Sequence, residues 1–108
     1  MASKLGEKLR ACRTAPNINL TLDEVARRAG VSKSYLWELE NRESLKPSAV
    51  KLQAIADVLQ QDTSFFLDDE VDTPQETHKD KEFFRSYSKL DTEAKAKLRQ
   101  ILEVLKKT

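Results

Sequence analysis

The sequence predicts an all-α protein: one compact helical domain followed by a helical appendage. Three observations support this. The 108 residues include only two Gly and three Pro while 34% are charged, a composition that suits helices joined by short turns. Apolar residues recur at helical spacing, and capping residues precede several of these stretches. A chain of this length has room for one modest core, so a large enzyme is not expected.

The first two helices have clear start and stop signals. One face of the first helix carries three side chains: Leu5, Leu9 and Cys12. The segment 14–17 ends this helix, because its proline lacks a backbone donor and restricts the preceding residue. Thr21 and Glu24 have the spacing of a capping box and begin a second helix. Gly30 ends it, since glycine tolerates the left-handed conformation.

Three further helices are predicted before residue 70. Ser32 caps a third helix that runs to Glu40 or Asn41, with Leu36 and Leu39 on its inward face. Pro47 and Ser48 open a fourth, whose predicted apolar stripe is Val50, Leu52, Ile55, Ala56 and Leu59. Asp62 caps a short fifth helix that contains Phe65, Phe66 and Leu67.

The charge distribution divides the chain into three parts. Residues 1–62 carry 10 basic and 8 acidic side chains, residues 63–80 carry 1 and 6, and residues 81–108 carry 8 and 4. The acidic stretch 68–78 contains one aliphatic residue and a proline, so it can bury little and is typical of a solvated linker. We therefore predict a domain at 1–68, a linker at 69–80 in which His78 is solvated, and a helical segment at 81–108.

The last segment contains an apolar stripe that must be buried somewhere. Phe83, Phe84 and Tyr87 predict a short helix, and Asp91 caps a longer one to about Lys106. The stripe has the rhythm of a helix-pairing seam, and the predicted dimerisation residues are Phe83, Phe84, Ala94, Leu98, Ile101, Leu102 and Leu105. The alternative is that this helix folds back on the core.

The second and third helices have the spacing of a helix-turn-helix, whose second helix enters the major groove of double-stranded DNA. Close crossing requires a small residue and a tight turn, and Ala26 and Gly30 stand at these positions. The shared core would comprise Val25, Ala29, Val31, Leu36 and Leu39. Four side chains of the third helix would then face outward: Lys33, Ser34, Trp37 and Glu38.

At these residues the sequence resembles the Cro and phage-repressor superfamily, often called the XRE family. The resemblance runs from Leu5 to about Leu67, and its most specific segments are 5–9, 21–32, 35–41 and 55–59. It implies a five-helix lambda-repressor-like DNA-binding domain. It also implies that Lys33, Ser34 and Glu38 read base edges, which their donor and acceptor groups permit.

The resemblance also implies that Arg13 pairs with Glu40 in a structural role. The sequence departs from the family at three positions. Leu22 stands where a phosphate-contacting glutamine is common, Arg42 replaces a glycine after the third helix, and Gln60 replaces a helix-ending glycine.

Several other residues are candidates for DNA contact. Five basic residues could anchor phosphates: Arg10, Arg27, Arg28, Arg42 and Lys46. Arg27 and Arg28 could instead only offset Asp23 and Glu24. Tyr35 could donate to a phosphate. Trp37 could pack on a sugar or a thymine methyl group, or on Pro47 or the linker.

Other classes of function find little support in the sequence. One His and one Cys provide neither a metal site nor a nucleophile with its base, so we expect no enzyme, no metal and no cofactor. Cys12 is interpreted as a partly buried thiol. No apolar run could cross a bilayer and the N-terminus does not resemble a signal peptide, so we expect no membrane contact and a cytoplasmic location.

The sequence thus favours a transcription regulator, most readily a repressor that binds a palindromic operator as a homodimer. The alternative is a protein-interaction module, such as an antitoxin or adaptor, that uses the same fold to hold a regulatory protein partner.

Overall fold

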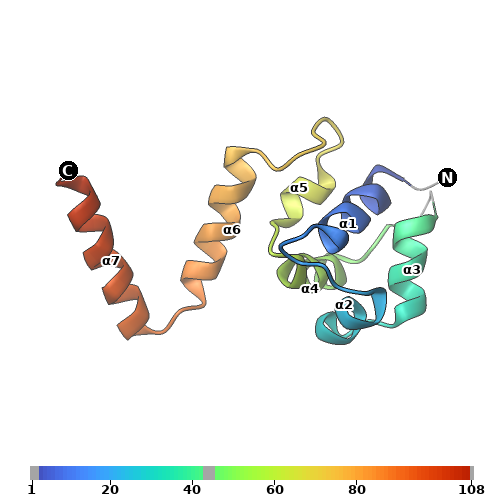
Figure 1. Cartoon of the computed structure of the whole chain (residues 1–108), viewed down its shortest axis with the longest axis horizontal. Coiled ribbons are helices and arrows are strands. Elements are labelled where there is room, and N and C mark those ends of the chain that lie inside the picture. The colour runs from blue at the N-terminus through green and yellow to red at the C-terminus, as the bar shows by residue number, and fades with distance from the viewer. Residues whose placement is uncertain (1–2, 43–45, 108) are drawn as a thin grey trace.

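The computed structural model describes residues 3–42 and 46–107, and within these ranges the chain forms only α-helices. This confirms the predicted fold class. The helices are α1 (Lys4–Thr14), α2 (Leu22–Ala29), α3 (Lys33–Asn41), α4 (Ala49–Leu59), α5 (Thr63–Leu67), α6 (Glu76–Ser88) and α7 (Thr92–Lys106). Figure 1 shows α1–α5 gathered into a compact unit, here called the head. α6 and α7, here called the arm, lead away from it as a V.

The predicted capping residues begin the helices as expected. In each case a side-chain oxygen accepts a hydrogen bond from a backbone N–H of the first turn, and the residues are Thr21, Ser32, Ser48, Asp62 and Asp91. Ser3, which the sequence analysis did not single out, caps α1 in the same way by accepting from the Gly6 N–H at 3.0 Å. Local chemistry therefore sets most of the helix boundaries.

Two helices end in a left-handed residue. Gly30 closes α2 with φ 73°, and Gln60 closes α4 with φ 58°. A Cβ atom makes this conformation costly, so Gln60 is strained where the resembling family has glycine. Glutamine in place of glycine at this position keeps the fold but lowers its stability.

The core of the head is formed by buried side chains from all five helices: Leu9, Val25, Ala26, Leu36, Leu39, Leu52, Ile55, Ala56, Leu59, Phe65 and Phe66. One predicted member of the α4 stripe is wrong, since Val50 is 81% exposed. At about 100° per residue, Val50 lies roughly 200° around the helix from Leu52 and so faces away from the core.

The predicted solvated linker is wrong in its second half. α6 begins at Glu76, and His78 is only 5% exposed. The imidazole packs edge-on against Phe65 with ring centroids 5.7 Å apart, and its Nδ1 accepts a hydrogen bond from the Gln75 N–H at 2.9 Å. The histidine thus joins the start of α6 to α5.

The first half of the linker is also attached to the head. The buried ammonium group of Lys8 donates hydrogen bonds to the Phe65 carbonyl at 2.8 Å and to the Asp68 carbonyl. The Lys4 ammonium donates to the Asp69 carbonyl at 2.6 Å, and Val71 packs against the core. Backbone carbonyls of an acidic segment are therefore held by two lysines of α1.

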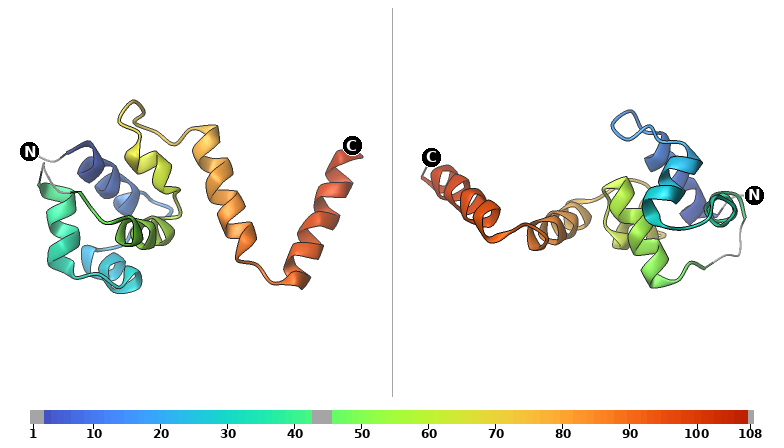
Figure 2. Two further views of the ribbon diagram at one scale, coloured as in Figure 1. Left: turned by 180° about the vertical axis from the view of Figure 1, so that it is seen from behind. Right: turned by 90° about the horizontal axis from the view of Figure 1, so that it is seen from below.

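Ion pairs attach α6 and the residue that follows it to the head. Asp57 on α4 forms ion pairs with Arg85 at 3.1 Å and Lys89 at 3.2 Å. No described residue of α7 is buried, and both views in Figure 2 show α7 separated from the head by α6. The alternative that this helix folds back on the core is therefore wrong. Among the described residues, no helix has the length and apolar character needed to span a membrane.

Candidate DNA-binding surface

The turn between α2 and α3 fixes the direction of α3. The Val31 N–H donates to the Ala26 carbonyl at 3.0 Å across the left-handed Gly30, which closes the turn. Ala26 is buried at the crossing, as the spacing predicted. Leu36 and Leu39 then point into the core, so the opposite side of α3 faces solvent.

The four side chains predicted to face outward lie together. Lys33, Ser34, Trp37 and Glu38 line one shallow hollow of about 250 Å³. Trp37 is 47% exposed, while Glu38 is half-buried. The Lys33 ammonium lies 3.4 Å from an Asp23 carboxylate oxygen on α2, so part of its charge is already compensated. The three predicted base readers thus form one surface with the tryptophan, here called the reading face.

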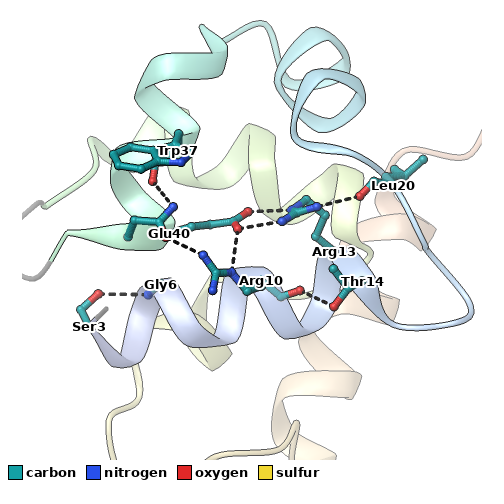
Figure 3. Close-up of polar contacts among 9 residues, drawn as sticks. Ser3, Gly6, Arg10, Arg13, Thr14, Leu20, Trp37 and Glu40 are labelled. Atoms are coloured by element: carbon teal, nitrogen blue, oxygen red, sulfur yellow. Dashed lines mark hydrogen bonds and ion pairs between the residues drawn. The ribbon is translucent and has the colours of Figure 1, made fainter. Parts of the chain in front are cut away.

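α1 holds α3 from behind through a buried carboxylate (Figure 3). Glu40 is 1% exposed and accepts from Arg13 Nε at 2.8 Å and Nη2 at 2.9 Å, which confirms the implied pair. Arg13 Nη1 also donates to the Leu20 carbonyl at 3.1 Å. The hydrogen bonds to Glu40 raise the pKa of Arg13, so the guanidinium stays charged in the folded protein.

A glycine allows this close approach of the two helices. A Cβ atom at Gly6 would lie 2.5 Å from the Glu40 carbonyl oxygen and 2.7 Å from that of Leu39. Both contacts are far shorter than van der Waals distance and involve backbone atoms. Any larger residue at this position would push α1 away from α3.

The predicted phosphate anchors differ in their exposure and in whether they already have a partner within the protein. Arg10 donates to Glu40 at 3.5 Å and to the Asn41 side-chain oxygen at 2.5 Å, although half of its side chain is exposed. Arg27 and Arg28 both pair with Glu24, as the alternative interpretation expected. Arg42 and Lys46 are exposed on either side of residues 43–45, which lie outside the described part of the chain. The assignment of all five as phosphate anchors stays a prediction.

A family model described as a helix-turn-helix domain matches residues 4–64. The chain belongs to this helix-turn-helix family. The match begins with α1 and ends inside α5, within the region that resembles the Cro and phage-repressor superfamily, and the chain is accordingly a helix-turn-helix DNA-binding regulator.

The whole fold, including the arm, also has a structural counterpart. A chain of the solved SinR protein/SinI protein complex aligns with a TM-score of 0.57 and 23% sequence identity, covering 96% of this chain and 99% of that chain. At this identity the similarity concerns the fold alone. The comparison with curated proteins gave no match.

One basic residue in contact with a candidate DNA-contacting side chain of this helix-turn-helix domain was missed by sequence reasoning. The Lys51 ammonium on α4 lies over the Tyr35 ring of α3, 4.6 Å from its centroid. The two side chains are 16 positions apart in sequence, so no local pattern could pair them. Tyr35 is half-buried and packs against the core, and the ammonium covers one face of its ring.

The predicted dimerisation residues largely gather around one apolar hollow of about 450 Å³ between α6 and α7. Its lining includes Phe83, Phe84, Leu98, Ile101, Leu102 and Leu105. Ala94 is not part of it, whereas Tyr87 and Arg99 are. The guanidinium of Arg99 lies 6.0 Å from the Tyr87 ring centroid, so the arginine borders the hollow through an aromatic contact.

Proposed function

We propose that this helix-turn-helix regulator is a cytoplasmic repressor that binds a palindromic operator as a homodimer. α3 would lie in the major groove with the reading face against base edges, and the arms of two copies would pair. The proposal includes no catalytic step and no cofactor. A bound dimer would act by blocking access to a promoter.

The observation that carries the proposal is the apolar hollow of the arm. Phe83, Phe84 and Ile101 are 56%, 71% and 57% exposed, and all three line it. Complete burial of one such side chain contributes about 1.5–3 kcal/mol. A surface this apolar on a small protein marks an interface, and a second copy of the arm offers a matching apolar surface.

A dimer would also double the number of base contacts, which the small reading face of one copy limits. Few base contacts fit on one short helix, and each good contact discriminates by only about 1–3 kcal/mol. Two heads on one face of a duplex require half-sites about one helical turn apart, roughly 34–36 Å. Since α6 is attached to the head through His78 and Asp57, the arms and not a loose linker would set this spacing.

Dimerisation through the arm can be tested with two matched lysine substitutions on α7. Ile101 and Val104 are 57% and 63% exposed, but only Ile101 lines the hollow. By light scattering, the unmodified chain should be a dimer, Ile101→Lys a monomer and Val104→Lys a dimer. A monomeric unmodified chain, or a dimeric Ile101→Lys variant, would contradict the proposal.

DNA binding can be tested by selecting duplexes from a random pool. The proposal expects a two-fold symmetric consensus whose affinity falls steeply with salt, because phosphate contacts release counterions. Combined alanine substitution of Lys33, Ser34 and Glu38 should greatly reduce the sequence preference. Arg42→Ala or Lys46→Ala should instead weaken binding to all sequences alike. Recovery of no preferred sequence would contradict the proposal.

A second candidate function is a protein-interaction module, for example an antitoxin or adaptor. The observation that favours it is the same apolar hollow, which could hold a helix of a different protein. The light-scattering experiment separates the two candidates. A chain that stays monomeric alone and binds no preferred DNA would support the interaction module.

A further inference from the structure

We propose that Trp37 is a specificity-determining residue that contacts the C5-methyl group of a thymine in each operator half-site. This rests on the proposed function and identifies one base that the reading face recognises. The indole is the apolar wall of the hollow, whose other lining residues are Lys33, Ser34 and Glu38.

Trp37 stands on the solvent-facing side of α3. Trp37 lies one helical turn after Lys33, and both side chains line the same hollow as Glu38. With 47% of its surface exposed, the side chain is available to a ligand in the groove. In Figure 3 the indole lies outside the cluster formed by Glu40 and the two arginines of α1.

The hollow combines polar walls with one apolar wall. Three of its walls are charged or hydroxyl-bearing and suit the polar base edges, whereas the indole offers a large apolar surface. Among the groups that bases display in the major groove, only the C5-methyl of thymine is apolar. A polar edge placed against the face of the indole, away from its N–H group, would lose hydration without gaining a partner, and so a thymine fits the hollow best.

Hydrogen bonds hold the turn of α3 that carries Trp37. The Asn41 side-chain nitrogen donates to the Trp37 carbonyl at 2.9 Å, and its side-chain oxygen accepts from Arg10 at 2.5 Å. Arg10 is in turn paired with the buried Glu40. The turn of α3 that carries the indole is therefore braced from α1, which makes Asn41 and Arg10 positioning residues for Trp37.

The test uses the full chain and the duplex recovered from the random pool. Each thymine of a half-site is replaced in turn by uracil, which lacks only the C5-methyl group. At one position the affinity of the unmodified protein should fall roughly fourfold per half-site, which corresponds to the free energy of burying one methyl group. Trp37→Ala should bind the thymine and uracil duplexes equally, and Trp37→Phe should keep part of the difference. Leu67→Ala, an exposed apolar residue on α5, serves as the control and should keep all of it.

Fluorescence gives a second measurement. Trp37 is the only tryptophan of the chain, so its emission reports on this site alone. Operator binding should change the emission, and a non-specific duplex should change it less.

The outcomes separate this inference from the proposed function. If no preferred duplex is recovered, both fail. If one is recovered but every uracil substitution leaves affinity unchanged, or Trp37→Ala keeps the preference for thymine, the inference alone is overturned. An emission that the operator leaves unchanged would overturn it as well.

Discussion

Removal of the buried carboxylate of Glu40 should destabilise the head severely. In Glu40→Ala, the Arg13 guanidinium would lose the partner of its Nε and Nη2 donors and keep only the Leu20 carbonyl. Breaking a buried ion pair by deleting one member costs about 3–5 kcal/mol, because a charge is left without compensation. The Arg13 side chain is 14% exposed, so water reaches the stranded group and we take the lower value, about 3 kcal/mol.

This loss is a large fraction of the unfolding free energy of such a domain, which is typically about 5–15 kcal/mol. For a domain of this size each kcal/mol lowers the melting temperature by about 4–8 °C, so the predicted decrease is about 12 °C or more. Glu40→Gln should lose less, since the amide oxygen can still accept one hydrogen bond. Both variants should be measured by thermal denaturation followed by circular dichroism, with reversibility checked.

The control is an exposed ion pair of similar composition. Lys97 and Glu93 on α7 are 72% and 81% exposed, and Lys97→Ala should cost less than about 1 kcal/mol. Folding raises the pKa of Arg13. The stabilisation that the ion pair provides is therefore fully present at every pH below the pKa of Arg13 in the unfolded chain, and it is lost only as the pH rises through the higher pKa of the folded state. The penalty of Glu40→Ala should therefore not vanish in mildly alkaline buffer. A decrease of only one or two degrees would refute this reasoning.

Three further variants test other parts of the head, all by thermal or chemical denaturation. Gly6→Ala should destabilise by about 1–3 kcal/mol or more, because its Cβ would meet two backbone carbonyls; unchanged stability would show that α1 can move freely. Gln60→Gly should stabilise by about 0.5–1 kcal/mol by relieving a left-handed residue, and a loss of stability would contradict the assigned strain. Burial raises the pKa of the Cys12 thiol, so the folded state retains a proton that the unfolded chain releases. The unfolding free energy should thus fall as the pH rises above the ordinary thiol pKa, and Cys12→Ala should lack this decrease.

The parts of the fold that depend on local chemistry could be predicted from the sequence. Serine and threonine commonly cap a helix when they precede an apolar stretch, and Thr21, Ser32 and Ser48 do so here. Gly30 closes a turn because glycine tolerates the left-handed conformation. The reading face followed as well, because the helical period alone determines which side of α3 opposes its buried leucines. Most side chains that line the hollow between the arm helices were likewise predicted as one apolar set, although their role in dimerisation stays a prediction.

The parts that depend on distant contacts could not be predicted. His78 stands in a polar, acidic segment, and only its contact with Phe65 from another helix makes it a buried residue. Val50 is apolar and close to an apolar stripe, yet its angle around α4 exposes it. In the sequence Lys8 resembles a surface lysine of an amphipathic helix, but in the structure its ammonium group is bound by the carbonyls of Phe65 and Asp68. In each case the deciding partner lies on an element whose position the local sequence does not encode.

The arrangement of the chain explains how a protein with a formal net charge of only +1 can present a surface suited to DNA. The acidic stretch 68–72 follows α5 and precedes α6, whereas α3 forms the opposite edge of the head (Figure 1). Screening weakens interactions between exposed charges beyond about 8–10 Å under physiological conditions, so the charges nearest the reading face matter most there. There the balance is set by nearby groups: Lys33 is partly offset by Asp23, whereas Arg42 and Lys46 are exposed beside the end of α3. The local distribution of charge, and not its sum, therefore determines whether this surface can approach a phosphate backbone.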